Sequence, residues 1–164
     1  MAFSGACYDV FISFRGEDTR LSFVGHLHKA LNEKGIHTFL PDHQLMRGDS
    51  IAASLVKAIQ SSMISIIVLS QNYASSKWCL DELVHIMENR RPVIPVFYYV
   101  DPSDVRHQKG IYGKALAMHE KSNLYSDKVM RWRNALRQVA DLSGFPFRHG
   151  DGYEYELTGK IVDD

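Results

Sequence analysis

The sequence predicts an α/β fold of the flavodoxin-like, three-layer type, with a five-stranded parallel sheet of strand order 2-1-3-4-5 and helices on both faces. Short runs of β-branched and aromatic residues alternate with segments of helical periodicity along most of the chain, which is typical of a parallel sheet. Two of these runs, Ser65–Leu69 and Val93–Val100, are largely apolar, as in strands that are buried on both faces. Right-handed crossovers between such strands favour the stated order.

The first half of the chain supplies three of the five strands. Strand formers at Tyr8–Phe14 are followed by Gly16, which allows a sharp exit. Apolar residues then recur at helical spacing from Thr19, and Gly35 is expected to end that helix. The next expected elements are a short strand at Ile36–Leu40, a turn-rich loop at Pro41–Gly48, a helix capped by Asp49 or Ser50, and a strand at Met63–Leu69.

The second half continues the alternation. The expected elements are a helix from Trp78 or Cys79 to about Asn89, a strand at Val93–Val100, helices at Tyr112–Lys121 and Lys128–Leu142, and a short strand at Gly144–Phe147. Because Pro146 cannot donate a ladder hydrogen bond, the last strand is placed at an edge of the sheet. We expect residues 1–7 to be a flexible N-terminal segment and residues 8–164 to form a single domain.

The composition argues against several classes of protein. Lys and Arg together number 19, as do Asp and Glu, so there is no basic excess to hold a nucleic-acid backbone. Cys7 and Cys79 lie far apart, which argues against a zinc ribbon or a disulfide scaffold and fits a reducing compartment. No apolar run approaches the ~20 residues of a membrane-spanning helix. We therefore expect no metal site, and neither a membrane nor a nucleic acid as a partner.

Glu82 is the clearest candidate for chemistry. It lies in the segment Ser76–Leu83, which follows the apolar strand and should sit near the carboxyl edge of the sheet, where ligands bind in open α/β folds. The helix dipole also explains an acidic residue at a helix start, as it does for Asp81, so position alone favours a structural role. Cys79 has no base at a recognisable spacing and is expected to be a buried free thiol.

Three motifs resemble the plant-type Toll/interleukin-1 receptor (TIR) domain. They are Tyr8–Arg20 (YDVFISFRGEDTR), Ser76–Leu83 (SKWCLDEL) and Pro95–Arg106 (PVFYYVDPSDVR). In that family the domain usually forms the N-terminal part of an intracellular immune receptor, followed by a nucleotide-binding domain and leucine-rich repeats. This chain shows neither, so its last residues are expected to lead toward an absent nucleotide-binding domain; a piece of a longer receptor and a natural short form both stay open.

The resemblance implies an enzyme that self-associates and cleaves NAD+ at the nicotinamide–ribose bond, giving signals that trigger defence and cell death. Glu82 would be the essential residue, with Phe14, Arg15, Gly16 and Trp78 around the nucleotide. NAD+ is then a substrate, and no cofactor is expected. The residues fit this chemistry in two respects. Nicotinamide leaves as a neutral molecule, so one carboxylate can suffice, and the first strand lacks the Gly-x-Gly-x-x-Gly turn of a hydride-transfer site. Hydrolysis, cyclisation and transfer are all open outcomes. Trp78 could equally anchor its helix in the core.

Two residues are implied in contacts between TIR domains, either between copies of this chain, as weak dimers to tetramers, or with other TIR domains. His26 is expected on an exposed helix face, but Gly25 replaces the serine that usually precedes it, which should weaken that contact. Gly144 resembles part of a second contact surface and is equally well explained as a helix stop. Association is expected to order the Pro41–Gly48 loop. The implied location is cytoplasmic, and a nuclear one stays open.

Two other functions compete with this prediction. In the first, the domain is a signalling adaptor that acts only through TIR–TIR contacts, and Glu82 is a helix-start residue. In the second, reported for some relatives, it makes cyclic nucleotides from nucleic acid; the even charge balance gives that activity little support.

Overall fold

The computed structural model describes residues 8–20, 22–41, 53–121, 126–142 and 144–147, together with residues 159 and 161. The expected N-terminal segment 1–7 and all of the expected loop after Pro41 lie outside these residues. In chain order the elements are β1 (Val10–Ser13), α1 (Gly16–Thr19), α2 (Phe23–Glu33), β2 (Thr38–Phe39), α3 (Ala53–Ser61), β3 (Ile64–Leu69), η2 (Tyr73–Ser75), α4 (Lys77–Glu88), β4 (Val93–Tyr98), α5 (Pro102–His107), α6 (Gly110–Lys121), α7 (Ser126–Ala140) and β5 (Phe145–Phe147).

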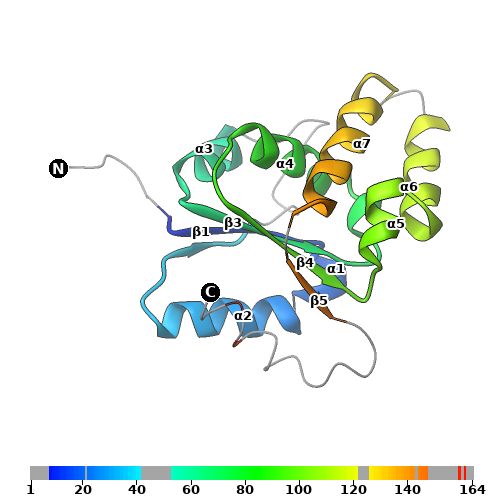
Figure 1. Ribbon diagram of the computed structural model, residues 1–164. Helices are drawn as coiled ribbons and strands as arrows, with labels where there is room; N and C mark the ends of the chain where they lie inside the picture. The colour runs from blue at the N-terminus through cyan, green and yellow to red at the C-terminus, as the bar shows by residue number, and fades with distance from the viewer. Residues whose placement is uncertain are drawn as a thin grey trace.

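The five strands form one parallel sheet with the order β2-β1-β3-β4-β5, which confirms the prediction (Figure 1). Ile66 in β3 pairs with Ile12 in β1 and with Ile94 in β4, so β-branched residues meet across the centre of the sheet. As expected from Pro146, β5 lies at an edge.

Each face of the sheet has its own apolar core, because successive strand residues point to opposite faces. Figure 1 shows α3, α4 and α7 over one face and α2 against the other. Phe11 and Ile67 pack in the cluster that includes α3, α4 and α7, whereas Ile12 and Ile66 pack in the cluster with α2. The carboxyl ends of the strands are thereby held between two helical layers.

Several elements differ from the sequence prediction: α1 and η2 were not predicted, β2 is shorter than expected, and α5 and β4 differ for clear physical reasons. The helix α5 was not predicted, because Val105 is its only buried residue and leaves no apolar period to detect. Its N-cap is Asp101, whose Oδ1 accepts a hydrogen bond from the Ser103 N–H at 2.8 Å. Strand β4 ends two residues early, since Tyr99 adopts a left-handed conformation with φ 58° that a strand cannot continue.

At Gly144 the chain passes very close to the backbone of the neighbouring strand β4. This close packing allows a test of stability. A Cβ at this position would lie 2.2 Å from the carbonyl oxygen of Pro95 in β4. Gly144→Ala is therefore expected to lower the free energy of unfolding by about 1–3 kcal/mol, as overpacking does. Urea denaturation measures this. Gly16→Ala is the control, because its nearest neighbour is the flexible Arg20 side chain at 3.4 Å; equal losses in both variants would contradict the close packing.

Candidate active site

Glu82 lies in the second turn of α4, deeper in the helix than predicted. The Ser76 hydroxyl caps the helix by accepting a hydrogen bond from the Cys79 N–H at 3.2 Å, so the helix begins at Lys77. Its first turn contains no acidic residue. The explanation of Asp81 and Glu82 by the helix dipole is thus wrong, because that effect falls off within the first turn.

The Glu82 carboxylate is fully buried against the end of β1. Ser13, the last residue of that strand, donates a hydrogen bond from Oγ to Glu82 Oε1 at 2.8 Å. The Ser13 hydroxyl also lies 2.7 Å from the hydroxyl of Tyr73 in η2, which in turn donates to the Cys79 carbonyl oxygen at 3.0 Å. All three side chains are 0% exposed. Sequence reasoning missed Ser13 and Tyr73; the available signal was a lone hydroxyl in an otherwise apolar strand.

Asp81, the neighbour of Glu82, faces the other way and joins α4 to α7. Its Oδ1 accepts a hydrogen bond from the indole N–H of Trp132 at 2.9 Å, and its Oδ2 lies 3.5 Å from the Lys128 ammonium. Asp81 and Trp132 are both buried. The packing of α7 therefore explains why Asp81 is buried. Its side chain points toward α7 and away from the contact between Glu82 and Ser13.

The connection from β3 to α4 is fixed by hydrogen bonds from α1 and α6. Asp18 in α1 accepts from the Ser70 hydroxyl at 2.6 Å and from the Asn72 N–H at 2.9 Å. From α6, the Tyr112 hydroxyl donates to the Ser70 carbonyl at 2.7 Å, and His119 Nε2 lies 2.9 Å from the Ala74 carbonyl. These contacts hold the backbone on which Tyr73 and the cap of α4 depend.

Arg15 and Gly16 follow β1 directly and lie at the start of α1. The Arg15 guanidinium is largely buried and pairs with Glu17 at 3.3 Å, and its Nε has no hydrogen-bond partner among the residues described. Burial and the charge of Glu82 raise the pKa of Cys79 in α4, and the positive charge of Arg15 partly opposes this rise. The placement of Arg15 around the nucleotide stays a prediction.

The two aromatic residues predicted to stack on the nucleotide differ in their surroundings. Phe14 is 1% exposed and packs in the core with α2, with the Arg20 guanidinium 4.8 Å from its ring centre. In this conformation the ring of Phe14 is buried against α2, so its placement around the nucleotide stays a prediction. Trp78 is half-buried at the start of α4, beside the Lys77 ammonium at 5.1 Å. Among the residues described, Trp78 packs in neither core cluster, so stacking on the nucleotide and anchoring of the helix both stay open.

Cys79 is a buried free thiol. Its Sγ donates to the Phe14 carbonyl oxygen at 3.4 Å. Burial raises the pKa of the Cys79 thiol, and the negative charge of Glu82 raises it further. A thiol that stays protonated is a poor nucleophile, which agrees with the sequence interpretation.

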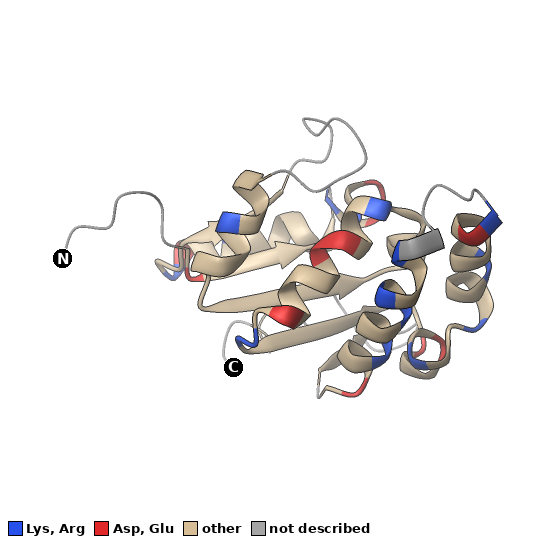
Figure 2. Cartoon of the chain, turned by 90° about the horizontal axis from the view of Figure 1, so that it is seen from above, with Lys and Arg blue, Asp and Glu red and all other residues tan. Residues whose placement is uncertain are grey.

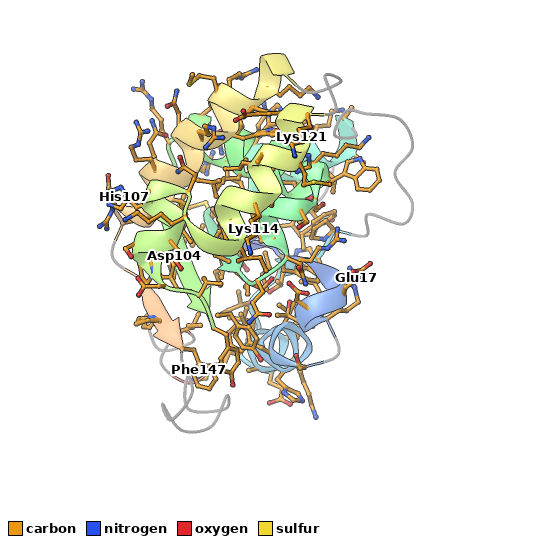
Figure 3. All side chains as sticks on the ribbon, turned by 90° about the vertical axis from the view of Figure 1, so that its right-hand side faces the viewer. Glu17, Asp104, His107, Lys114, Lys121 and Phe147 are labelled. Atoms are coloured by element: carbon orange, nitrogen blue, oxygen red, sulfur yellow. The ribbon has the colours of Figure 1, made fainter. Side chains whose placement is uncertain are left out.

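A pocket of about 260 Å³ opens at the carboxyl edge of the sheet, lined by Asp18, Ser70, Gln71, Tyr98 and Tyr99. Figure 3 looks onto this side of the molecule, with Glu17 pointing outward from α1 and Lys114 on α6. Glu82 does not line this pocket. The pocket and Glu82 thus both lie at the carboxyl edge of the sheet, but Glu82 is not exposed in the pocket. We take Glu82 as the centre of the candidate site because its carboxylate suits the predicted chemistry.

The two residues implied in TIR–TIR contacts lie in different environments. His26 is exposed on α2, as predicted. A Cβ on the preceding Gly25 would lie 2.7 Å from the Arg20 carbonyl oxygen, so the turn between α1 and α2 disfavours a serine there. Gly144 does not stop a helix, since α7 ends at Ala140; the close approach to β4 explains it instead.

Within the described residues, no group of three His, Cys, Asp or Glu side chains could hold a metal ion. A search of the same residues finds no helix of the length and apolar character needed to span a membrane.

Comparison with known proteins places this arrangement in a family. The model of the TIR domain matches residues 7–162. The disease resistance protein RUN1 of Vitis rotundifolia is 51% identical over 163 residues, covering 95% of this chain and 12% of that protein. The TMV resistance protein N of Nicotiana glutinosa is 52% identical over 144 residues, covering 84% and 12%. This chain thus spans about an eighth of these relatives.

Solved structures agree with the fold. The TIR domain in the activated Roq1 resistosome, which directly recognises the pathogen effector XopQ, superposes with a TM-score of 0.87 at 52% identity, covering 96% of this chain and 98% of that one. The TIR domains of the RPS4 and RRS1 heterodimer give a TM-score of 0.54 at 23% identity, covering 94% and 93%, which supports the fold alone.

The raised pKa of Cys79 makes stability depend on alkaline pH. The unfolded thiol loses its proton near its ordinary value of 9.0, whereas the folded thiol keeps it. The unfolded state then binds fewer protons, so the stabilisation is complete below about pH 9 and is lost as the pH rises. Between pH 9 and 11 the free energy of unfolding should fall less steeply in Cys79→Ala than in the parent, by up to about 1.4 kcal/mol per pH unit. Urea denaturation of both proteins in a Cys7→Ser background measures this, and parallel pH curves would contradict it.

Proposed function

This chain belongs to the TIR domain family, and we propose that it is an NAD+ nucleosidase that releases nicotinamide and an ADP-ribose-type product. It is a TIR domain of the kind found in plant disease resistance proteins. The proposal extends to defence signalling by the product, with NAD+ as substrate and no separate cofactor.

The placement of Glu82 carries the proposal. Its carboxylate is fixed beyond the end of β1 by the Ser13 hydroxyl at 2.8 Å, and Arg15 follows the same strand. When the C1′–N1 bond of NAD+ breaks, its electron pair leaves with neutral nicotinamide and positive charge develops on the ribose. A fixed carboxylate stabilises that charge, and no acid is needed for the leaving group. Water then adds to C1′ and loses a proton, which gives ADP-ribose.

The burial of Glu82 supports dependence on association. A ribose cannot contact a side chain that is 0% exposed, so this conformation is a resting one. We propose that contact between TIR domains favours a rearranged conformation in which the carboxylate is reached. The assembly of TIR domains in the activated Roq1 resistosome, to which this chain is similar, supports such a step.

The same burial favours a second candidate, a signalling adaptor that acts only through TIR–TIR contacts. In that function Glu82 is a buried packing residue of α4 that accepts a hydrogen bond from Ser13. Nucleic acid is disfavoured as a substrate under either function. Figure 2 shows residues of both charge signs over the helices, and Glu88 pairs with Arg131 at 2.8 Å, whereas a phosphate track needs unpaired basic residues.

Glu82→Gln tests the enzyme proposal. The amide keeps the size of the side chain but removes its charge, so nicotinamide release from NAD+ at high protein concentration should fall by about 100-fold or more. The matched control is Glu88→Gln on the same helix, whose exposed carboxylate should be dispensable. Circular dichroism checks that both are folded. Equal release by Glu82→Gln and the parent would refute the role of Glu82. Loss of release with cell-death signalling intact would favour the adaptor.

His26→Ala tests the association step. His26 is exposed on α2, so its loss should weaken contacts between domains without unfolding the chain. We expect the protein concentration at half-maximal specific activity to rise about tenfold, as for a contact worth ~1.4 kcal/mol. His28→Ala is the control, because that ring lies 3.2 Å from Asn32 on its own helix. If His26→Ala leaves the dependence of specific activity on protein concentration unchanged, this face of α2 is not part of the contact between domains.

A further inference from the structure

The pocket of about 260 Å³ at the carboxyl edge of the sheet has no part in the chemistry proposed for Glu82, which does not line it. Its lining residues come from three places in the chain that follow β1, β3 and β4: Asp18, the pair Ser70 and Gln71, and the pair Tyr98 and Tyr99. Pockets that hold drug-sized ligands measure about 300–1,000 Å³. The volume therefore suits a smaller molecule.

The lining carries a negative charge that no basic residue balances. The Asp18 carboxylate accepts hydrogen bonds from the Ser70 hydroxyl at 2.6 Å and from the backbone and side-chain amides of Asn72 at 2.9 and 3.0 Å. All of these donors are neutral. In the part of the chain that the structure describes, no lysine or arginine pairs with Asp18, and none lines the pocket. The pocket thus has a carboxylate without a counter-ion.

The aromatic wall of the pocket is held by strained backbone and by ring contacts. Tyr99 has φ 58°, a left-handed conformation that is uncommon for an aromatic residue, and its N–H donates to the Phe147 carbonyl oxygen at 2.8 Å. The Tyr98 ring stacks on Phe23 and Phe147 at 5.4 and 5.9 Å, and the Tyr99 ring meets it edge-on at 4.7 Å. Tyr98 is buried and Tyr99 half-buried, so Tyr99 is the more accessible ring. Backbone strain of this kind often occurs at ligand sites.

We propose that this pocket binds a small organic ammonium ion, with Asp18 supplying the opposite charge and Tyr99 an aromatic surface. Such an ion is attracted both to a carboxylate and to the ring of a tyrosine, whereas the charge of Asp18 disfavours a phosphate. Glu17 on α1 and Lys114 on α6, which Figure 3 labels, are of opposite sign and do not line the pocket. The site goes beyond the proposed function and does not depend on it.

Tetramethylammonium is the probe for the site, and tert-butanol is its neutral counterpart of similar size. The whole chain is titrated with each, and the backbone amide resonances of Ser70, Gln71 and Tyr99 are followed. Tetramethylammonium should cause saturable shifts that sodium chloride at the same concentration does not, and tert-butanol should bind about tenfold more weakly or less. Tyr8, which precedes the amino end of β1, should not respond. No saturation, or equal binding of the two probes, would overturn the proposal.

Two opposite substitutions of Gln71 test the role of charge. The residue is exposed, so its replacement leaves the core intact. Gln71→Lys should raise the Kd of tetramethylammonium about tenfold, because it places a positive charge at the pocket, and Gln71→Glu should lower the Kd. Gln60→Lys is the matched control, since Gln60 is exposed near the end of α3, which leads to the opposite end of β3. Changes of the same sign in both Gln71 variants, or an equal change in Gln60→Lys, would contradict a charge-selective site.

Asp18→Asn removes the charge itself and should abolish the preference for tetramethylammonium over tert-butanol. A preference that survives refutes the role of Asp18, and if this variant unfolds, the Gln71 pair decides. NAD+ separates the pocket from the substrate site. Its two phosphates should prevent it from displacing tetramethylammonium, and displacement would make the pocket part of the substrate site and overturn the inference. Nicotinamide release, whatever its outcome, bears only on the proposed function.

Discussion

The burial of two adjacent carboxylates in α4 constrains the rest of the structure. Asp81 and Glu82 are 8% and 0% exposed, and a buried carboxylate without hydrogen bonds costs several kcal/mol. Because successive helical residues are about 100° apart around the axis, the two side chains need partners on different sides. Ser13 at the end of β1 satisfies one, and Trp132 in α7 satisfies the other. The helix is thus fixed between the sheet and α7, and a shift of either neighbour removes a hydrogen bond from a buried carboxylate.

Hydrogen bonds also fix the segment between β3 and α4, although it contains few apolar residues. Ser70 is bonded both by Asp18 and by Tyr112, and the Ala74 carbonyl is bonded by His119, whose ring meets that of Trp132 edge-on at 5.1 Å. Helices α1, α6 and α7 therefore all bear on the segment that orients Tyr73 and Ser76. A site supported in this way is precise, and it is also sensitive to movements of the surrounding helices. Contacts made far from Glu82 can for this reason alter its environment.

The sequence was sufficient for the sheet order and for the location of Glu82, because apolar strands and helical periods are local signals. It was insufficient where a role depends on distant contacts. Ser13 and Tyr73 are 60 residues apart, and nothing in their spacing indicates that their hydroxyls meet at 2.7 Å. Phe14 was placed around the nucleotide, and the sequence did not show that its ring packs against α2 in this conformation. Gly144 was predicted either as part of a contact surface or as a helix stop, and the Pro95 backbone beside it was not foreseen. The catalytic role of Glu82, and those of Arg15, Gly16 and Trp78, stay predictions.

Under the proposed function, a site buried in this way suits control by weak association. To reach a substrate, Glu82 must give up its bond to Ser13 and the packing around it, and one buried hydrogen bond and its local packing together amount to about 3 kcal/mol. A monomer then spends roughly 1% of its time in the open conformation. A contact between domains that binds the open form about 10⁴-fold more tightly inverts this ratio. A few well-placed side chains on an interface can supply that difference. Under the proposed function, the burial that stabilises the fold would also set the threshold for activity, and the interface would have to supply the free energy needed to cross it.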